Sequence, residues 1–317
     1  MQFRKIKDED FDIIAQSQSN TLYNGSEYSA LYLKGWEFFN YPEMEIAFED
    51  GVIYIRFIPH DKYKEEFDTT KYIYLPPLCA LDKIKDAYAK IEEQSKADDD
   101  LMYVMATPDE YVEILGDEYV YKHNDDYDEY LYLPENLITL TGKRYHGKRN
   151  HINNFIKLYA PDEEGSECRF RSYEERDYKK VMALIAGWDE KKEFDEDSYD
   201  EMKNDEFKVI ELGLKMIFGG CDRCFADVIE YGDKIIAFCF GEITPSNVGI
   251  VHFEKGDINF EGVYPYVNQR VAQKHFKEVR YINRQEDMGL EGLRKSKQSY
   301  YPAAFARKNV VESKKEQ

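Results

Sequence analysis

Polar side chains crowd residues 281–302, which read YINRQEDMGLEGLRKSKQSYYP. The end of a short predicted strand carries Asn283, Arg284, Glu286 and Asp287, and the helix that follows carries Arg294, Lys297 and Tyr300 on one face. A carboxylate at such a place could position an attacking amine or accept its proton. Arg294 or Lys297 could hold a phosphate or a carbonyl oxygen, and Tyr300 could donate a proton. The alternative is a salt-bridge network that joins the helix to the sheet.

A second polar stretch, VHFEKGDINFEGVYPYVN, occupies residues 251–268. His252 and Glu254 alternate at the end of a predicted strand, so we expect them on one face and Lys255 on the other, with a turn at Asp257. Open α/β sheets bind ligands at the carboxyl ends of their strands, which favours a binding site here. The alternative is a polar strand end without a ligand.

Positive charge is concentrated in residues 140–155, LTGKRYHGKRNHINNF, inside a chain whose net charge is -20. The basic side chains are Lys143, Arg144, Lys148 and Arg149. Arginine forks onto two oxygens of a phosphate or carboxylate, so this run could bind an anionic ligand. The alternative is a solvated helix face that pairs with the chain's own carboxylates.

The composition argues against several classes of protein. An acidic surface repels phosphate backbones and anionic membranes, so we expect no DNA partner and no integral membrane contact. The most apolar runs, 181–188 and 235–240, are far too short to cross a bilayer, and the first residues lack the apolar segment of a signal peptide. We therefore expect a cytoplasmic protein whose oligomeric state the sequence leaves open.

The five cysteines are Cys79, Cys168, Cys221, Cys224 and Cys239. Their odd number and irregular spacing do not resemble a secreted disulfide framework. Cys221 and Cys224 form a lone CxxC motif without a second pair at metal spacing. We interpret these thiols as buried or incidental and expect no metal site; a zinc or redox role for the CxxC pair is the alternative.

Hydrophobic spacing predicts an α/β chain of two domains. A hairpin at 45–59 is followed by helices at 81–94 and 109–115 and by strands at 101–107 and 127–133. The second half shows the order β-α-α-β-β-β-α-β-α-β, with strands at 168–173, Cys224–Tyr231, Lys234–Ile243, 247–254, 279–283 and 303–311. The best linker is PDEEG at 161–165, so we expect domains at 1–160 and 166–317. The order of the second half matches that of the acyl-CoA N-acetyltransferase (GNAT) fold.

Four motifs resemble a known family. They are LTGKRYHGKRNHINNF at 140–155, HFEKGD at 252–257, YPYVN at 264–268 and the outline INREDxGxxGLRxxKxSYxP within 281–302, from which Gln285 is a departure. Over residues 38–311 the chain resembles bacterial proteins with a phosphatidylglycerol lysyltransferase C-terminal-type domain. The resemblance implies two tandem GNAT-like domains, as in the Fem-type peptidoglycan aminoacyltransferases, each a mixed, mostly antiparallel sheet flanked by helices.

The resemblance also implies a class of reaction. Characterised relatives move an aminoacyl group from charged tRNA to a lipid or a peptidoglycan amine. We therefore expect an acyl- or aminoacyltransferase that uses aminoacyl-tRNA or an acyl thioester such as acyl-CoA and acts on an amine or hydroxyl. The chain shows neither the membrane-spanning portion of the lysyltransferases nor the Gln/Arg-x-x-Gly-x-Gly/Ala loop that holds the CoA pyrophosphate. The alternative is a non-catalytic GNAT-like module that binds an anionic small molecule or a tRNA acceptor arm.

The candidate site follows from these motifs. The candidate catalytic residues are Glu254, Glu286, Asp287 and Tyr300. The candidate substrate-binding residues are Lys143, Arg144, Lys148, Arg149, Asn150, His252, Lys255, Asp257, Tyr264, Asn268, Asn283, Arg284, Arg294 and Lys297. We expect the three polar stretches to converge on one hollow between two sheets.

Overall fold

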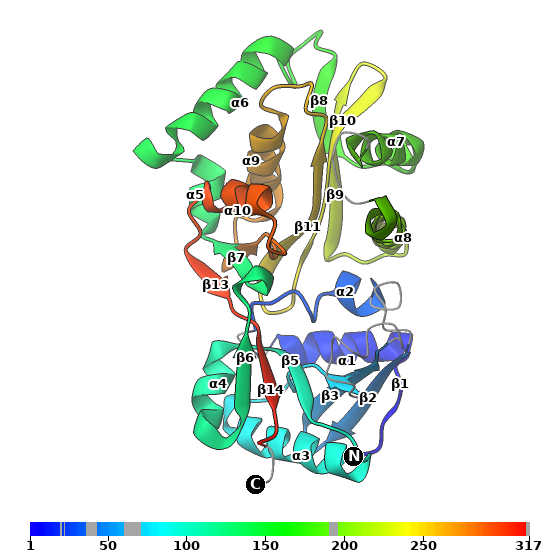
Figure 1. Ribbon diagram of the computed structural model, residues 1–317. Helices are drawn as coiled ribbons and strands as arrows, with labels where there is room; N and C mark the ends of the chain where they lie inside the picture. Colours follow the sequence, from blue (N-terminus) through cyan, green and yellow to red (C-terminus); the bar gives the residue numbers. More distant parts are fainter. Residues whose placement is uncertain (20, 22, 36–42, 60–70, 190–195, 315–317) are drawn as a thin grey trace.

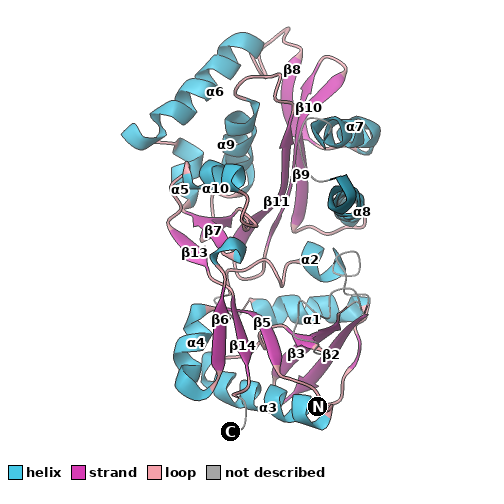
Figure 2. Ribbon diagram, in the orientation of Figure 1, coloured by secondary structure: helices cyan, strands magenta, loops and turns pink. Residues whose placement is uncertain are grey.

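The structure is a computed structural model that describes residues 1–19, 21, 23–35, 43–59, 71–189 and 196–314. Its strands form two mixed sheets of seven strands each, one above the other in Figure 1. Helices flank both sheets (Figure 2), which confirms the predicted α/β class. Within the described residues, no helix has both the length and the apolar character that a membrane span needs.

The N-terminal sheet has the strand order β1-β2-β3-β4-β5-β14-β6. Its strands are β1 (Arg4–Lys5), β2 (Glu43–Glu49), β3 (Val52–Ile58), β4 (Ile73–Tyr74), β5 (Tyr103–Thr107), β6 (Val120–His123) and β14 (Asn309–Glu312). Helices α3 (Ile84–Ala97) and α4 (Asp109–Leu115) cover one face, and α1 (Asp8–Gln18) covers the other. The predicted hairpin forms β2 and β3, and it turns at Gly51 with a φ of 75°, which glycine adopts without strain.

The C-terminal sheet has the strand order β13-β7-β12-β11-β10-β9-β8. Its strands are β7 (Glu129–Tyr132), β8 (Cys168–Ser172), β9 (Cys224–Tyr231), β10 (Lys234–Ile243), β11 (Val248–Gly256), β12 (Tyr281–Asn283) and β13 (Ala304–Ala306). Helices α5 (Pro134–Thr139), α6 (His146–Tyr159) and α9 (Val263–His275) pack on one face, and α7 (Tyr178–Asp189) and α8 (Glu196–Phe218) on the other. With α10 (Glu291–Gln298) between β12 and β13, the predicted GNAT-like element order is confirmed.

The chain crosses between the sheets at 124–128 and at 307–308, not at the predicted linker 161–165. Strand β7 and helices α5 and α6, which we expected in the first domain, belong to the C-terminal sheet and its α9 face. The single strand predicted at 303–311 is two strands, because β13 pairs with β7 whereas β14 pairs with β5 and β6. Local apolar spacing marks a strand but does not say which sheet it joins.

Helix α2 (Ala30–Gly35) packs against both halves of the molecule. Leu33 lies in the buried cluster between α1 and the N-terminal sheet, whereas Leu31 lies in the cluster that contains residues of α7 and α8. The fully buried Glu242 of β10 accepts hydrogen bonds from the backbone N–H groups of Ala30 at 2.8 Å and Leu31 at 3.3 Å. The first N–H groups of a helix have no partner within it, so Glu242 fixes α2 against the C-terminal sheet.

A buried lysine joins the two halves at the second crossing. Lys308 Nζ lies 2.7 Å from Glu27 Oε1 and 2.8 Å from Glu129 Oε1. Glu286 Oε2 lies 3.6 Å from the same nitrogen. Burial raises the pKa of Glu129 to about 7 despite the charge of Lys308, and the neighbouring carboxylates Glu27 and Glu286 add to this effect. We call these four residues the Lys308 junction.

We expect Glu129→Gln to change how stability depends on pH. Folding raises the pKa of Glu129 from 4.5 to about 7, so between these values the folded chain binds more protons than the unfolded chain. The free energy of unfolding therefore falls as the pH rises through this window, and Glu129→Gln should remove that contribution. Urea denaturation between about pH 5 and pH 7 measures it. Equal slopes in the wild type, in Glu129→Gln and in the exposed control Glu113→Gln would contradict the junction.

Candidate functional site

Strands β11 and β12 lie side by side only at the start of β11. Residues 248–250 pair in parallel with β12, which ends at Asn283. Beyond Ile250, β11 pairs only with β10 among the described strands, and it continues to Gly256. The two strands therefore part. The backbone of residues 284 and 285 stays bonded to Tyr130 of β7, while β11 beyond Ile250 has no strand on that edge among the described residues.

A β-bulge in β11 separates His252 from Glu254. The register with β10 pairs Phe240 with Phe253 and then skips His252. The His252 ring consequently packs on the α7–α8 face, with its centroid 5.8 Å from that of Phe240. Glu254 instead contacts Asn268 of α9 on the opposite face. The prediction that His252 and Glu254 share a face is wrong, because an extra residue resets the alternation of a strand.

Two donors hold Glu254 on the α9 face. Asn268 Nδ2 donates to Glu254 Oε2 at 2.9 Å, and Arg284 Nη2 donates to Glu254 Oε1 at 3.1 Å. The side chains of Glu254 and Arg284 are each only 10% exposed, so their charges interact in a medium of low dielectric constant. The fold thus brings the polar stretch 251–268 to the polar stretch 281–302, as the sequence predicts. We call Glu254, Asn268, Arg284 and Tyr300 the Glu254 cluster.

Two polar atoms of this cluster are buried and have no hydrogen-bond partner among the described residues, namely Arg284 Nη1 and Asn268 Oδ1. The guanidinium carbon of Arg284 lies 4.8 Å from the ring centroid of Tyr300, so an aromatic ring lies against it. Buried polar atoms without partners are rare in folded proteins and mark places where water or a ligand completes the hydrogen bonding. One donor and one acceptor, both from side chains that bind Glu254, suit a ligand that offers a carbonyl oxygen and an N–H group.

Lys148 is the basic residue of the run 140–155 that reaches this cluster. Its Nζ lies 3.9 Å from the ring centroid of Tyr300. Burial lowers the pKa of Lys148 to about 8, and the charge of Arg284 adds to this effect. Lys148 therefore gains and loses its proton close to neutral pH.

The rest of the basic run does not converge on the Glu254 cluster. Arg149 donates to two backbone oxygens in the turn between α5 and α6, which closes that turn. Arg144 is exposed and lies over the ring of Tyr301, 5.3 Å from its centroid. Lys143 and Asn150 are exposed as well. These residues present a basic surface at the start of α6.

Lys297 shapes the backbone of residues 284–286. Its buried Nζ donates to the backbone oxygens of Arg284 at 2.7 Å and Gln285 at 3.0 Å, and also to that of Glu286. Gln285 has a φ of 58°, and this left-handed conformation costs a residue other than glycine about 1–2 kcal/mol. Three carbonyl oxygens around one cation offset that cost. Lys297 therefore positions the backbone that carries Arg284.

Asp287 and Arg294 form an ion pair, and both oxygens of the Asp287 carboxylate accept hydrogen bonds. Arg294 Nε and Nη2 donate to Asp287, each at 2.8 Å, and Nη2 also donates to Asp126. Tyr130 Oη donates to Asp287 at 2.5 Å and Gly289 N at 2.9 Å. Arg294 lowers the pKa of Asp287 to about 2 against the effect of burial, and Tyr130 and Gly289 add to the lowering. The pair anchors α10 to β7.

On the α7–α8 face, His252 meets polar groups from neighbouring segments. Its Nδ1 lies 3.4 Å from Gln285 Nε2, and its Nε2 lies 3.5 Å from Glu242 Oε2. Glu286 contacts Lys308 and so belongs to the Lys308 junction. The candidate residues of the two polar stretches are therefore divided between the Glu254 cluster and the opposite face of the sheet.

Four further candidate residues have other partners. Lys255 forms an ion pair with Glu206 of α8 at 2.8 Å. Asp257 accepts hydrogen bonds within the turn after β11, and Asn283 donates to the carboxylate at the start of β7. Tyr264 is half-buried at the start of α9.

The Lys308 junction was missed by the sequence reasoning. Its members are far apart in the chain, since Lys308 and Glu129 are separated by 179 positions. The one signal was the pair Arg307 and Lys308, two charges that interrupt the apolar run 303–311. That interruption marks the crossing between β13 and β14.

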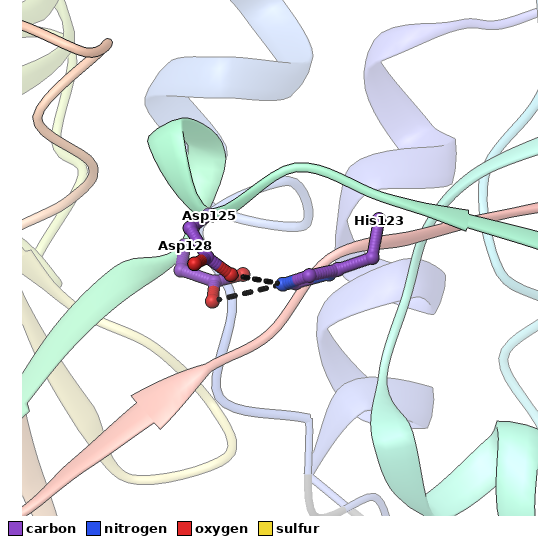
Figure 3. Close-up of side chains that lie close together, drawn as sticks. All are labelled: His123, Asp125 and Asp128. Atoms are coloured by element: carbon purple, nitrogen blue, oxygen red, sulfur yellow. Dashed lines mark hydrogen bonds and ion pairs between the residues drawn. The ribbon is translucent and has the colours of Figure 1, made fainter.

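His123, Asp125 and Asp128 have the donor types of a metal site and lie at the end of β6 and in the segment that leads to β7 (Figure 3). His123 Nε2 lies 2.8 Å from Asp125 Oδ1 and 3.3 Å from Asp128 Oδ2. These spacings equally suit a histidine N–H that donates to the two carboxylates, and Arg307 Nε lies 4.0 Å from Asp128. The group links the two strands at the first crossing. The expectation of no metal site stays a prediction.

Comparison with known proteins decides the family. The family model described as phosphatidylglycerol lysyltransferase, C-terminal, matches residues 63–311. The chain belongs to this family. An uncharacterized protein of Mycoplasmoides gallisepticum is 24% identical to this family member over 305 residues, which cover 93% of this chain and 95% of that protein. The family assigned from the four sequence motifs is confirmed.

Two solved structures share the fold of this lysyltransferase-family chain. A conserved protein of unknown function from Bacteroides thetaiotaomicron matches with a TM-score of 0.80 and 24% identity, covering 98% of this chain and 99% of that chain. L-PGS from Bacillus licheniformis matches with a TM-score of 0.60 and 12% identity, covering 99% and 94%. Both alignments extend over both sheets, so the two-sheet fold is common to all three proteins.

In this family member we expect Asp287→Asn to reduce stability. Folding lowers the pKa of Asp287 from 3.8 to about 2, so the ionised carboxylate stabilises the fold above about pH 4 and that stabilisation is lost as the pH falls through 2. The two pKa values differ by an amount that corresponds to about 2 kcal/mol. The variant should lose about this much at pH 7, because Arg294 keeps only the ion pair with Asp126. Urea denaturation measures the loss; a change no larger than that of exposed Asp233→Asn would contradict the anchor role.

Proposed function

We propose that the chain transfers an acyl or aminoacyl group from an activated ester or thioester to an amine or hydroxyl, and that the Glu254 cluster is its active site. The observation that supports this most directly is the pair of buried, unpartnered atoms, Arg284 Nη1 and Asn268 Oδ1, where β11 and β12 part. Membership of a family described by lysyl transfer supports the same class of reaction.

Arg284 acts on the donor in this proposal. Its Nη1 donates to the carbonyl oxygen of the ester or thioester and stabilises the negative charge that develops there on attack. Glu254 and Tyr300 already fix the guanidinium, so Arg284 does not have to reorient during the reaction. The small exposure of Arg284 strengthens this interaction, because little water screens it.

Glu254 and Asn268 act on the acceptor. Asn268 Oδ1 accepts a hydrogen bond from the attacking amine or hydroxyl, and Glu254 takes the proton that the nucleophile loses. A new bond forms between the acceptor nitrogen or oxygen and the carbonyl carbon, and the bond from that carbon to the leaving oxygen or sulfur breaks. The Glu254 carboxylate is held by Asn268 and Arg284, so it faces the reacting atoms in one orientation.

Tyr300 serves the leaving group. Burial raises the pKa of Tyr300 well above its usual range, so the phenol keeps its proton and can give it to the departing oxygen or sulfur. Lys148 also lies over this ring, with a pKa of about 8. In its charged form it adds positive potential beside the developing oxyanion.

We expect Arg284→Ala to lower transfer about 10²–10³-fold, the cost of removing one oxyanion donor. The assay incubates the purified chain with radiolabelled aminoacyl-tRNA or acyl-CoA and a panel of amine and hydroxyl acceptors, and counts the label that is transferred. The matched control is Arg169→Ala on β8, where the arginine is exposed and far along the sheet order from β12. No transfer from either donor, or equal losses in the two variants, would contradict the proposal.

A basic surface at the start of α6 favours a polyanionic donor. Lys143 and Arg144 are exposed there, on a chain whose net charge is -20. Local positive potential can recruit a phosphate backbone even when the whole protein is acidic. The same surface would serve the alternative function, a module that binds a tRNA acceptor arm or an anionic small molecule without turnover.

We expect joint charge reversal, Lys143→Glu with Arg144→Glu, to raise KM for aminoacyl-tRNA and leave kcat unchanged. Each lost phosphate contact should flatten the dependence of log affinity on log salt by about 1. Lys234→Glu, at an exposed position in β10, is the control. A charge-reversed chain that uses aminoacyl-tRNA like the control would exclude this surface. Salt-sensitive tRNA binding without any transfer would instead favour the binding module.

A further inference from the structure

Cys221 and Cys224 lie in a tight turn between α8 and β9. The backbone N–H of Cys224 donates to the carbonyl oxygen of Cys221 at 3.2 Å, which closes the turn over four residues. The chain enters it from the end of α8 through Gly220, whose φ is 88°. The first and fourth Cα atoms of such a turn are less than about 7 Å apart, and disulfides span about 4.4–6.8 Å between Cα atoms.

The two sulfur atoms already lie next to each other. Cys221 Sγ and Cys224 Sγ are 3.1 Å apart, and a disulfide bond is about 2.05 Å long. An approach of about 1 Å, within reach of side-chain rotation in a turn, would join them. The three other cysteines, Cys79, Cys168 and Cys239, are buried in the hydrophobic interior.

The two thiols differ in exposure and in acidity. Cys221 is half-buried, whereas Cys224 is buried as the first residue of β9. The adjacent Cys224 thiol lowers the pKa of Cys221 to about 6, and the backbone N–H groups of Arg223 and Cys224 add to this effect. The same pairing, followed by burial, raises the pKa of Cys224 above its usual range. Cys221 is therefore the accessible nucleophile and Cys224 the shielded partner.

A metal site explains this arrangement less well. Structural zinc needs four ligands, commonly cysteine or histidine. Within the described residues, three or more metal-ligating side chains come together only at His123, Asp125 and Asp128. Cys221 and Cys224 thus have no third ligand in the part of the chain that the structure describes.

We propose that Cys221 and Cys224 form a thiol–disulfide exchange site that takes small-molecule disulfides as its substrates. The Cys221 thiolate attacks one sulfur of the disulfide, whose S–S bond breaks and releases one thiolate. Cys224 loses its proton to water and attacks the sulfur of Cys221, and the second thiolate of the substrate departs. Two protein thiols are oxidised to one disulfide, and the substrate disulfide is reduced by the same two electrons.

The cysteine pair lies at the start of β9, next to the residue of β10 that holds α2. Cys224 pairs in register with Glu242 of β10, and Glu242 holds the backbone N–H groups of Ala30 and Leu31. None of these residues belongs to the Glu254 cluster, so the exchange site is distinct from the proposed transferase site and is tested independently of it.

The experiment treats the reduced full-length chain with oxidised glutathione at pH 7, quenches with acid and measures intact and peptide masses. The wild type should lose the mass of two hydrogen atoms and yield a peptide linked between Cys221 and Cys224. Cys224→Ser should instead keep one glutathione on Cys221, because no partner resolves the mixed disulfide. Cys221→Ser should react no faster than the buried thiols, and Cys79→Ser should match the wild type.

Other outcomes overturn the proposal. They are a wild-type chain that keeps glutathione on Cys221, a linkage that involves Cys79, Cys168 or Cys239, or a Cys224→Ser variant that forms no adduct. The alkylation rate of Cys221 should also rise with pH through about 6 and shift to higher pH in Cys224→Ser. A rate that rises only above about pH 8, as for an ordinary thiol, would remove Cys221 as the nucleophile.

Discussion

One buried cation, Lys297, binds the three carbonyl oxygens of residues 284–286, which follow β12. The rest of the proposed site depends on that contact. It stabilises the left-handed Gln285 and fixes the backbone of Arg284, whose guanidinium donates to Glu254 of β11 beyond the end of the β11–β12 pairing. Without the lysine, the carbonyl groups of Arg284 and Glu286 would lose the donor that Lys297 supplies, and that of Gln285 would keep only the backbone N–H of Tyr130 at 3.3 Å. Lys297 is thus a positioning residue, although its sequence context resembles that of a ligand-binding residue.

The same segment also connects the halves of the molecule. Glu286 points to Lys308, which Glu27 and Glu129 contact from other parts of the chain. Asp287 anchors α10 through Arg294, and so each residue from Arg284 to Asp287 has a different task. Because Lys308 follows β13 and precedes β14, the strand that completes the N-terminal sheet is attached directly to the segment that carries Arg284.

Much of the fold could be predicted because its signals are local. Strands β9 and β10 begin and end where the sequence predicts, since the turns that bound them carry clear turn residues such as Gly232. The meeting of Glu254 with Arg284 also follows from strand ends in the sequence. The bulge at His252 could not be predicted, because β11 is buried on both faces up to that residue and shows no alternation that an extra residue could interrupt. Nor could the partners of Lys308, since they are brought together only by the sheets themselves.

The basic run shows the same limit within one helix. The sequence does not distinguish Lys143, Arg144, Lys148 and Arg149. In the structure Lys148 is half-buried beside the Glu254 cluster, and Arg149 donates to the backbone of the turn before α6.

The central claim is that the carbonyl oxygen of the acyl donor binds Arg284 Nη1. A crystal structure with a stable amide analogue of an aminoacyl ester tests it most directly. The account predicts that this oxygen lies within hydrogen-bond distance of Arg284 Nη1, beside the ion pair of Arg284 with Glu254. An analogue bound elsewhere, with Arg284 Nη1 still without a partner, would contradict it.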